Sequence, residues 1–421
     1  MVRHETLAEW LDAQQSVHPQ SIDLGLARIT KVARDLGIDK ARCPVITVGG
    51  TNGKGSVVAH SDAFLRTLGF STGVFTSPHL VRYNERICVN GAEVSDAELV
   101  SAFDRIEAAR GPTTLTYFEY SALAALLIFA DRRVDVIVLE VGLGGRLDAA
   151  NLIDADVAVV TSIGFDHRDW LGDTLDAIGR EKAGIFRAGR PAVLGSPQMP
   201  ASVYGTIASL GARQVVAESN FTWAVHAGGW NYHGLDISLD GLPASALAGA
   251  IQYRNAATAL AAVESLHMLK RLDAQVVSTA LRTVQLRGRF QVVPGPVEWI
   301  LDVCHNEPAA RVFASHLAAR PSLGRTIAVV AILGDKDITA IGTLLRPLVD
   351  EWIVCSVSEP RGLPAEEQVR RLALRADSVR LAASADAGCE AARGRAVPGD
   401  RVVVCGGFHV VGSALRWLQI Y

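Results

Sequence analysis

The chain has 421 residues, 49% of them apolar, which is enough for two or three domains with sizeable cores and excludes a disordered chain. Its formal net charge is only −3 and no long run of one sign occurs, so we expect no nucleic-acid partner. Residues 1–5 lead into a polar, helix-like stretch without the apolar core of a signal peptide, and the longest apolar runs (122–130 and 134–141) are shorter than the ~20 residues that span a bilayer. The six cysteines form no C-x-x-C pair, so we expect a reduced cytoplasmic protein without a zinc site or a disulfide framework.

Short β-branched runs alternate with longer helical segments in the first part of the chain. This alternation predicts a parallel sheet with crossover helices. We expect strands at 45–48, 73–75, 134–140, 157–162 and 192–194, and helices at 56–68, 96–110, 119–130 and 175–183.

Glycines and aromatic residues cluster between 212 and 250, which favours a small antiparallel β subdomain. Helices are expected at 255–270 and 274–285, and the stretch 292–296 is typical of a linker. A second α/β pattern follows, with strands at 298–302, 326–332, 352–356 and 401–405. The predicted fold is therefore α/β: a P-loop parallel-sheet domain with a β subdomain (1–294) and a smaller Rossmann-like domain (295–421).

A glycine loop, Gly-Gly-Thr-Asn-Gly-Lys-Gly-Ser at 49–56, follows the first strand and precedes a helix. In this context the backbone N–H groups and the helix N-terminus bind phosphate, and the lysine neutralises its outer oxygens. The spacing departs from G-x-x-x-x-G-K-[ST], because the loop is shorter and a glycine separates lysine from serine. The residues expected to bind ATP here are Asn52, Gly53, Lys54, Gly55 and Ser56.

Ten ordered motifs, spread over nearly the whole chain, resemble the folylpolyglutamate synthase and dihydrofolate synthase family, which is related to the Mur peptidoglycan ligases. They are S-I-D-L-G-L (21–26), G-T-N-G-K-G-S (50–56), S-P-H-L (77–80), Y-F-E (117–119), E-V-G-L-G-G-R-L-D (140–148), D-H (166–167), R-E-K-A-G-I-F (180–186), G-R-F (288–290), D-x-x-H-N (302–306) and G-D-K-D (334–337). The resemblance implies that ATP phosphorylates a carboxylate and that the amine of glutamate attacks the acyl phosphate. This agrees with elementary chemistry, since a carboxylate resists an amine until it has a leaving group.

The resemblance also implies a site for two Mg²⁺ ions, formed by Ser77, Glu140, His167 and a carbamylated Lys182. Glu140 ends an apolar strand, where a carboxylate faces the ligand crevice of a parallel sheet. For the other ligands the residues alone leave alternatives open. From the residues alone, a hydrogen-bonded loop histidine is the better interpretation of His167, since Mg²⁺ prefers oxygen, and Lys182 fits a lysine favoured by the C-terminal helix dipole.

By the same resemblance, Asn255, Arg289 and Asp302 contact the adenine, phosphate and ribose of an ATP molecule that bridges the two domains. An arginine fork suits phosphate, but Arg289 also fits an interdomain salt bridge. His305, Asn306, Asp335 and Asp337 would recruit glutamate or help to close the domains, and His305 joins Lys54 and Lys182 as a candidate catalytic residue. Cys304 and Glu307 depart from the family pattern, which has alanine and proline at these positions.

Three segments correspond to the family's pterin-binding loops. In the aromatic segment, Phe118 offers a flat face for stacking on a heteroaromatic ring, although an aromatic residue at a helix start is more often part of the core. The expected substrate-binding residues are Asp23, Leu24, Thr116, Tyr117, Phe118, Glu119, Leu147, Asp148 and Ala149.

The leading hypothesis is a bifunctional, monomeric enzyme that adds L-glutamate to dihydropteroate and to reduced folates, because segments 22–26 and 115–120 are most similar to the bifunctional bacterial type. A folylpolyglutamate synthase without the first activity is the close alternative. A Mur-type cell-wall ligase is a second alternative, against which the pterin-type loops argue. A nucleotide-dependent regulatory protein is a third, but pure binding does not need the metal and lysine constellation.

Overall fold

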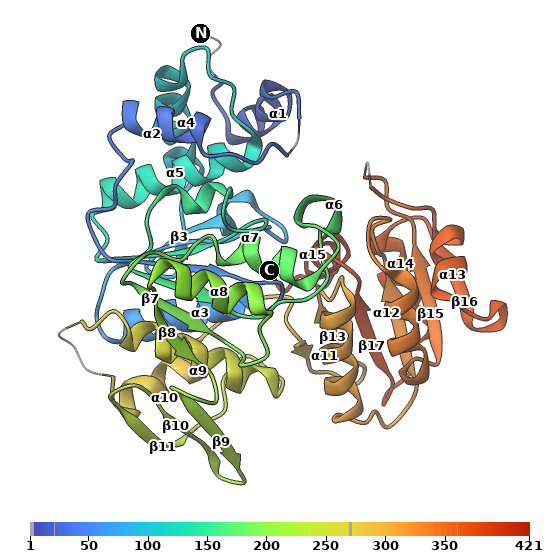
Figure 1. Ribbon diagram of the computed structural model, residues 1–421. Helices are drawn as coiled ribbons and strands as arrows, with labels where there is room; N and C mark the ends of the chain where they lie inside the picture. Colours follow the sequence, from blue (N-terminus) through green and yellow to red (C-terminus); the bar gives the residue numbers. More distant parts are fainter. Residues whose placement is uncertain (1–3, 21, 269–271, 360) are drawn as a thin grey trace. The chain divides into compact units, whose positions relative to one another are not determined.

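The computed structural model describes residues 4–20, 22–268, 272–359 and 361–421, and the chain forms two compact units (Figure 1). Unit 1 comprises Met1–His79, Tyr83–Ala246 and Tyr253–Val284, and unit 2 comprises Leu80–Arg82, Leu247–Gln252 and Gln285–Tyr421. Each unit is thus assembled from separate stretches of sequence. Ser21, in the first motif, and Lys270, at the expected end of a helix, lie outside the described residues.

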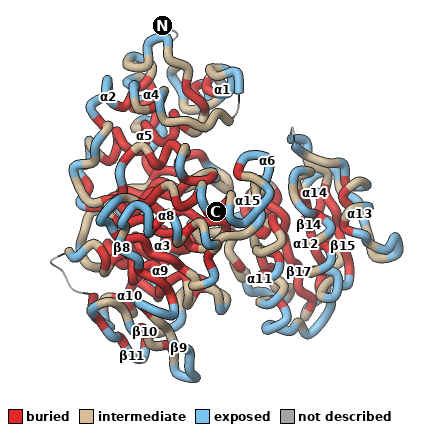
Figure 2. Tube along the Cα trace, viewed as in Figure 1, coloured by how far each residue is buried: buried red, intermediate tan, exposed pale blue. Residues whose placement is uncertain are grey.

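Unit 1 is built on an eight-stranded sheet. Strands β2, β5, β1, β6, β7 and β8 are parallel, as predicted, and β3 and β4 are added antiparallel at one edge. Apart from β8, whose first two residues are exposed, the parallel strands are buried at every residue, which explains their mostly apolar sequences (Figure 2). The sheet order is β4 (Ala92–Glu93), β3 (Ile87–Val89), β2 (Thr72–Phe75), β5 (Val136–Glu140), β1 (Val45–Gly49), β6 (Val157–Val160), β7 (Pro191–Leu194) and β8 (Arg213–Val216).

The helices of unit 1 cover this sheet. The predicted helices are present as α3 (Lys54–Thr67), α4 (Asp96–Arg110), α5 (Tyr117–Arg132) and α7 (Leu175–Ala183). Helices α1 (Leu7–Val17) and α2 (Ala27–Asp35) pack with α4 and α5 in one group (Figure 1). α5 is buried along most of its length, and a capping box between Thr116 and Glu119 fixes its first turn. The remaining elements are η1 (Tyr83–Arg86), η2 (Ala149–Leu152), α6 (Arg168–Leu171) and α8 (Ala201–Leu210).

The antiparallel subdomain is smaller than predicted. It consists of β9 (Thr222–His226), β10 (Gly229–His233) and β11 (Ser238–Leu242), with Trp230 and Tyr232 fully buried. The expected start at 212 is wrong, because β8 pairs with β7 in the large parallel sheet. The helices that follow are α9 (Ile251–Glu264) and α10 (Ala274–Thr283), and α10 contacts both β11 and α3.

Unit 2 contains a six-stranded sheet that is parallel except for β12. The order is β12 (Gln291–Val293), β13 (Glu298–Asp302), β17 (Arg401–Cys405), β14 (Thr326–Val330), β15 (Glu351–Cys355) and β16 (Val379–Ala382). The expected linker at 292–296 is wrong in its first part, because β12 pairs antiparallel with β13. Helices α11 (Glu307–Ala318), α12 (Ile338–Leu345) and α13 (Ala365–Leu372) cover one face, and α14 (Ala385–Arg395) and α15 (Phe408–Trp417) the other. Two short helices, η3 (Arg346–Leu348) and η4 (Ala376–Ser378), complete the unit.

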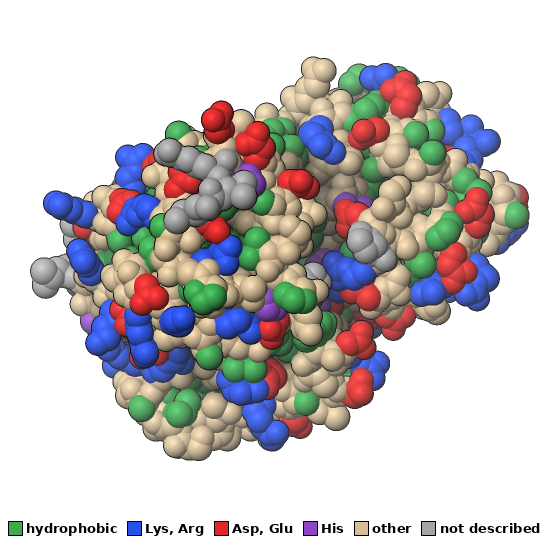
Figure 3. Space-filling view, turned by 90° about the horizontal axis from the view of Figure 1, so that it is seen from above, with side chains coloured by type: hydrophobic (Ala, Val, Ile, Leu, Met, Phe, Trp, Pro, Cys, Tyr) green, Lys and Arg blue, Asp and Glu red, His purple; other side chains and the backbone are tan. Residues whose placement is uncertain are grey.

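The surface charge agrees with the composition. On the face drawn in Figure 3, Lys and Arg side chains are interspersed with Asp and Glu. Within the described ranges, no helix has the length and apolar character needed to cross a membrane.

Candidate active site

The glycine loop of unit 1 joins β1 to α3 and is held by the segment that follows β6. The backbone N–H of Asn52 donates to Ser162 Oγ (3.1 Å), and Thr161 Oγ1 donates to the carbonyl of Asn52 (2.7 Å). Gly50 has a φ of +136°, and a Cβ at this position would overlap Thr161 Oγ1. Gly53 has a φ of +90° at the N-cap of α3. The loop therefore requires glycine at both positions, and hydrogen bonds within the chain hold its conformation.

Two lysines converge on this loop. Lys54 Nζ and Lys182 Nζ each donate a hydrogen bond of 3.0 Å to the carbonyl oxygen of Gly50. Lys182 is buried, and burial, followed by the charge of Lys54, lowers its pKa to about 7, against the opposing effect of Asp166 and Asp148. The structure thus brings together two residues predicted from distant motifs, and it favours an uncharged amine at Lys182.

The predicted metal ligands lie at the carboxyl edge of the same sheet. Glu140 pairs with Val48 across β5 and β1, next to the start of the glycine loop, and its Oε2 accepts a hydrogen bond from the backbone N–H of Ser77 (3.3 Å). His167 begins α6 with a φ of +50°, and its backbone N–H donates to Asp166 Oδ1 (2.9 Å). The described residues contain no group of three or more His, Cys, Asp or Glu arranged to hold a metal. For the predicted ligand set to hold a metal, Lys182 would have to be modified, since an ammonium cannot be a ligand and a carbamate can.

Two of the predicted pterin-binding segments meet at Gly142. A Cβ on this glycine would lie 2.7 Å from Phe118 Cζ and 3.3 Å from Asp148 Oδ2, so only glycine fits between them. Asp148 accepts hydrogen bonds from the N–H groups of Leu143 (2.8 Å) and Ala150 (2.9 Å). Burial raises the pKa of Asp148 to about 6, although these hydrogen bonds act in the opposite direction. Leu147 and Ala149 flank this carboxylate at the start of η2.

The third segment, with Asp23 and Leu24, is tied to the start of α5 through Arg28. Arg28 Nη1 lies 2.6 Å from Asp23 Oδ2, and its Nη2 donates to Glu119 Oε1 (3.2 Å). The ring of Tyr117 packs edge-on against that of Tyr83, with 5.5 Å between the ring centres, and the ring centres of Phe118 and Phe75 are 5.6 Å apart. Phe118 thus contacts the core as well as Gly142, and its stacking on a ligand stays a prediction.

The predicted nucleotide contacts are divided between the units. In unit 1, Asn255 Oδ1 would lie 3.0 Å from a Cβ on Gly53, so the asparagine side chain abuts the glycine loop. In unit 2, Asp302 accepts hydrogen bonds from the backbone N–H groups of Phe290 and Cys304 (both 2.8 Å), and its burial raises its pKa above the usual value. The guanidinium of Arg289 lies 5.1 Å from the ring centre of Phe408.

The remaining predicted residues of unit 2 follow strand ends. His305 Nδ1 lies 3.1 Å from the carbonyl oxygen of Val303. Asn306 and Asp337 cap α11 and α12, respectively, by accepting from backbone N–H groups, and Asp335 pairs with Arg361 (3.0 Å). The two departures from the family pattern are accommodated, because Cys304 is buried in the core and Glu307 pairs with Arg311.

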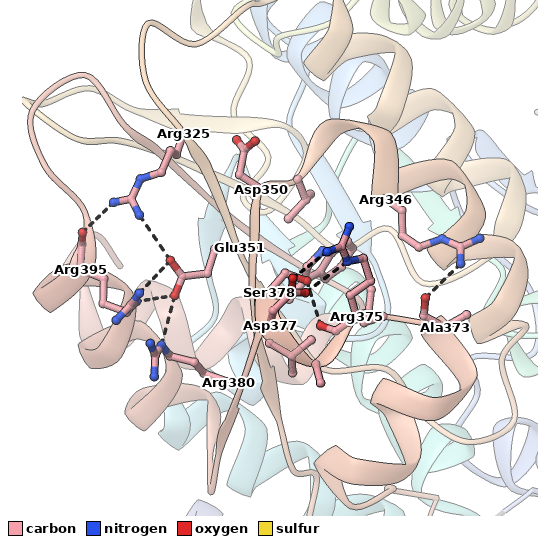
Figure 4. A pocket seen from close by; sticks show the side chains of 15 residues that line it. Arg325, Arg346, Asp350, Glu351, Ala373, Arg375, Asp377, Ser378, Arg380 and Arg395 are labelled. Carbon is pink, nitrogen blue, oxygen red and sulfur yellow. Dashed lines mark hydrogen bonds and ion pairs between the residues drawn. The ribbon is translucent and has the colours of Figure 1, made fainter.

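A pocket of about 730 Å³ lies elsewhere in unit 2 (Figure 4). It lies at the amino ends of β14, β15 and β16, and its charged groups bind one another, with Arg325, Arg380 and Arg395 all paired to Glu351. In parallel α/β sheets, ligands bind at the carboxyl ends of the strands. Asp302 and His305 are at that other end, so this pocket is not the candidate active site.

Comparison with known proteins assigns the family. The Mur ligase middle domain matches residues 48–195, and the Mur ligase, glutamate ligase domain, matches residues 288–408. The dihydrofolate synthase/folylpolyglutamate synthase of Escherichia coli is 40% identical over 410 residues, covering 97% of this chain and 95% of the relative. The chain belongs to the dihydrofolate synthase/folylpolyglutamate synthase family. It is an ATP-dependent ligase, as the motifs predicted.

Two solved structures of this ligase family match over the whole chain. Escherichia coli FolC in complex with DHPP and ADP has a TM-score of 0.94 and 39% identity, covering 100% of this chain and 99% of that one. A bifunctional folylpolyglutamate synthase/dihydrofolate synthase with Mn, AMPPNP and L-glutamate bound has a TM-score of 0.92 and 40% identity, with the same coverage. These matches confirm the two-domain α/β fold.

Sequence reasoning missed three residues of this ligase's candidate site. They are Arg28, Thr161 and Asp166; the last belongs to the D-H motif, which by itself assigns it no role. Each acts through contacts or charge over long sequence distances, such as the 91 residues between Arg28 and Glu119. No local signal marks Arg28, whose partner Glu119 is distant in sequence, and Thr161 falls inside the expected strand 157–162, whereas β6 ends at Val160.

Proposed function

We propose that the chain ligates L-glutamate to dihydropteroate, forming dihydrofolate, and to reduced folates, forming folylpolyglutamates. The observation that carries the proposal is the convergence of Lys54 and Lys182 on the glycine loop, beside the strand that ends in Glu140. This arrangement suits transfer of a γ-phosphoryl group to a carboxylate. The relatives with bound DHPP, ADP, AMPPNP and L-glutamate support the choice of substrates.

The proposed reaction has two steps. The acceptor carboxylate attacks the γ-phosphorus of ATP and releases ADP, and the amine of glutamate then displaces phosphate from the acyl phosphate. The loop residues Asn52, Gly53, Gly55 and Ser56 offer backbone N–H groups and a hydroxyl to the phosphates, and Lys54 stabilises the developing charge. Two Mg²⁺ ions, held by Ser77, Glu140, His167 and Lys182, would neutralise the transferring phosphoryl group.

Carbamylation of Lys182 is part of the proposal. Two ammonium groups on one buried carbonyl oxygen repel each other, and the surroundings of Lys182 favour its neutral form. A neutral amine adds to CO₂ and loses a proton to give a carbamate anion. This change replaces an unfavourable buried cation by a carboxylate-like ligand for magnesium.

For the other contacts, Asn255, Arg289 and Asp302 are proposed to bind the nucleotide, and His305 to recruit glutamate. Asn306, Asp335 and Asp337 are proposed to assist in recruiting glutamate; in this structure they cap α11, pair with Arg361 and cap α12, respectively. We also propose that the enzyme is a cytoplasmic monomer: the monomer is what the family resemblance implies, and six cysteines without a disulfide fit a reduced compartment. Light scattering on the purified protein, with and without ATP, tests the monomer.

The deciding experiment is product analysis by mass spectrometry. The protein is incubated with ATP, Mg²⁺ and L-glutamate, and with either dihydropteroate or tetrahydrofolate. We expect ADP release that depends on glutamate, and a glutamylated product, with both acceptors. Product with tetrahydrofolate alone would favour the folylpolyglutamate synthase alternative. Turnover with a UDP-sugar acceptor instead would favour a Mur-type ligase, and ATP hydrolysis that needs neither acceptor nor amine would favour a regulatory protein.

A further inference from the structure

Four charged or titratable side chains form a connected network beside the candidate acceptor site, and its centre has no role in the proposed chemistry. Arg28, in α2, binds Asp23 Oδ2 through Nη1 (2.6 Å). Its Nη2 donates both to the carbonyl oxygen of Asp23 (2.9 Å) and to Glu119 Oε1 (3.2 Å). His18 closes the network, with Nε2 3.1 Å from Asp23 Oδ2 and Nδ1 2.9 Å from Thr114 Oγ1.

Arg28 is the only cation in direct contact with the buried carboxylate of Glu119 among the described residues. The Glu119 side chain is 4% exposed, and burial raises its pKa against the effects of the Thr116 N–H and Arg28. A carboxylate this buried is stable only when it is paired and hydrogen-bonded. Removing the guanidinium would therefore disturb the first turn of α5 as well as Asp23.

The geometry requires an arginine. One guanidinium nitrogen serves the Asp23 carbonyl and Glu119 together, while the other serves the Asp23 carboxylate. The single ammonium of a lysine lacks this planar fork and cannot reproduce three contacts in two directions. The fork thus fixes segment 22–24 against the start of α5.

The first turn of α5 carries Phe118. Glu119 Oε2 accepts from the backbone N–H of Thr116 (2.8 Å), and Thr116 Oγ1 accepts from the N–H of Glu119 (3.2 Å). Phe118 lies inside this capping box and contacts Gly142, whose neighbour in space is Asp148. Arg28 therefore determines how segment 22–24 sits relative to the aromatic face and carboxylate that are proposed to bind the pteridine ring.

We propose that Arg28 is a positioning residue that sets acceptor specificity in favour of dihydropteroate. This inference rests on the proposed function. Dihydropteroate has no glutamyl group, so its affinity depends entirely on contacts to its ring system and benzoate. Folate acceptors carry, in addition, glutamyl carboxylates and amides that can make further contacts with the protein. If the ring-binding segments are loosened, dihydropteroate therefore loses a larger share of its affinity than a folate acceptor does.

The test measures kcat and KM for dihydropteroate and tetrahydrofolate in Arg28→Lys and Arg28→Gln, at saturating ATP and glutamate. We expect KM for dihydropteroate to rise about 10-fold or more, as for loss of a charge-assisted hydrogen bond, with a smaller rise for tetrahydrofolate and an unchanged KM for ATP. Arg34→Gln is the matched control, because Arg34 lies on the same helix with a side chain that is 70% exposed. An equal rise for both acceptors, or no rise, overturns the proposal.

A double-mutant cycle with Glu119→Gln separates positioning from general destabilisation. Glutamine keeps an oxygen for the Thr116 N–H but loses the charge that Arg28 binds, so the effects of the two substitutions on dihydropteroate affinity should be strongly non-additive. Additive effects would contradict the proposal. If the wild-type enzyme forms no product with dihydropteroate, the proposed dihydrofolate synthase activity is wrong. Equilibrium binding of dihydropteroate to the same variants, measured with a non-hydrolysable ATP analogue present, still decides the role of Arg28.

Discussion

Lys182 and Lys54 donate to the same carbonyl oxygen. In the proposed mechanism only Lys54 remains a cation, because Lys182 forms a carbamate. Lys182→Met keeps the length and apolar stem but cannot form a carbamate. We expect glutamate-dependent ADP release to fall at least about 100-fold, because the phosphoryl group loses its charge stabilisation. Lys40→Met, at an exposed position, is the control. NMR of protein equilibrated with ¹³C-bicarbonate should show a carbamate signal in the wild type that is missing in Lys182→Met, and near-normal turnover of Lys182→Met would contradict the assignment.

His60 gives a pH-dependent prediction. It is fully buried in α3, with Nδ1 2.7 Å from the Ser56 carbonyl oxygen and Nε2 2.9 Å from Ser245 Oγ, and burial lowers its pKa from 6.5 to about 4. The unfolded chain therefore binds more protons than the folded one between these values. The stability that neutral His60 contributes is fully present above pH 6.5 and is lost as the pH falls towards 4, by on the order of 2–3 kcal/mol.

Urea unfolding at pH 7 and pH 5 measures this effect. The wild type should lose more stability between the two pH values than His60→Gln, whose side chain does not titrate. His226→Gln, in the exposed β9 end, should behave like the wild type. An identical pH dependence of wild type and His60→Gln would show that the pKa of His60 is the same in the folded and the unfolded chain, and would contradict the prediction.

The candidate site was predictable from sequence where a residue follows a strand or lies within a motif. Lys54 and Glu140 belong to this group, since the carboxyl ends of parallel strands meet at one edge. Arg28 was not predictable, because its importance comes from a partner 91 residues away. The contact between Phe118 and Gly142 was hidden for the same reason, since no local pattern reports which side chain will lie above a glycine.

At the scale of elements, the glycine loop gives the sharpest prediction. Alanine at position 50 would be strained at a φ of +136° and would overlap Thr161 Oγ1, which holds the Asn52 carbonyl. We expect Gly50→Ala to weaken ATP binding at least about 10-fold and to cost about 2 kcal/mol of stability. Calorimetric titration with an ATP analogue measures the first effect. Gly205→Ala, in exposed α8 with open space around its Cβ, should leave affinity unchanged and stabilise by about 0.5–1 kcal/mol.

Elements were predicted well where burial is complete on both faces. β1 and β5 are buried at every residue and appear in the sequence as short, mainly β-branched and apolar runs. The change in composition at 212 places β8 in the predicted subdomain, and with Arg213 and Gln214 exposed the strand has no continuous apolar run that would indicate otherwise. The partial burial of β16 likewise leaves it without a clear strand pattern. β12 precedes a Gly-Pro pair, so local turn chemistry concealed its pairing with β13. Edge strands carry weak patterns because half of their environment is solvent.

At the scale of the whole molecule, neither unit is a continuous stretch of chain. Residues Leu80–Arg82 leave the sequence of unit 1 and belong to unit 2, where Leu80 and Val81 pack on the cluster that contains Val410 and Val411. A Cβ on Gly412 would overlap the Leu80 carbonyl oxygen, and one on Gly288 would lie 3.4 Å from Leu80 Cδ1. Gly288 and Gly412 of unit 2 thus make room for the segment Leu80–Arg82, which lies far earlier in the sequence.

This discontinuity predicts that a substitution early in the sequence destabilises the late unit. Leu80→Ala removes a partly buried side chain and should lower the stability of unit 2 by about 1–3 kcal/mol. Hydrogen exchange followed by mass spectrometry should show lost protection in β13 and β17, with protection in β1 and β5 retained. Leu323→Ala, at a fully exposed position in unit 2, should change neither. Lost protection confined to unit 1 would contradict the assignment of Leu80, since a two-unit chain need not unfold in one step and exchange reports each unit separately.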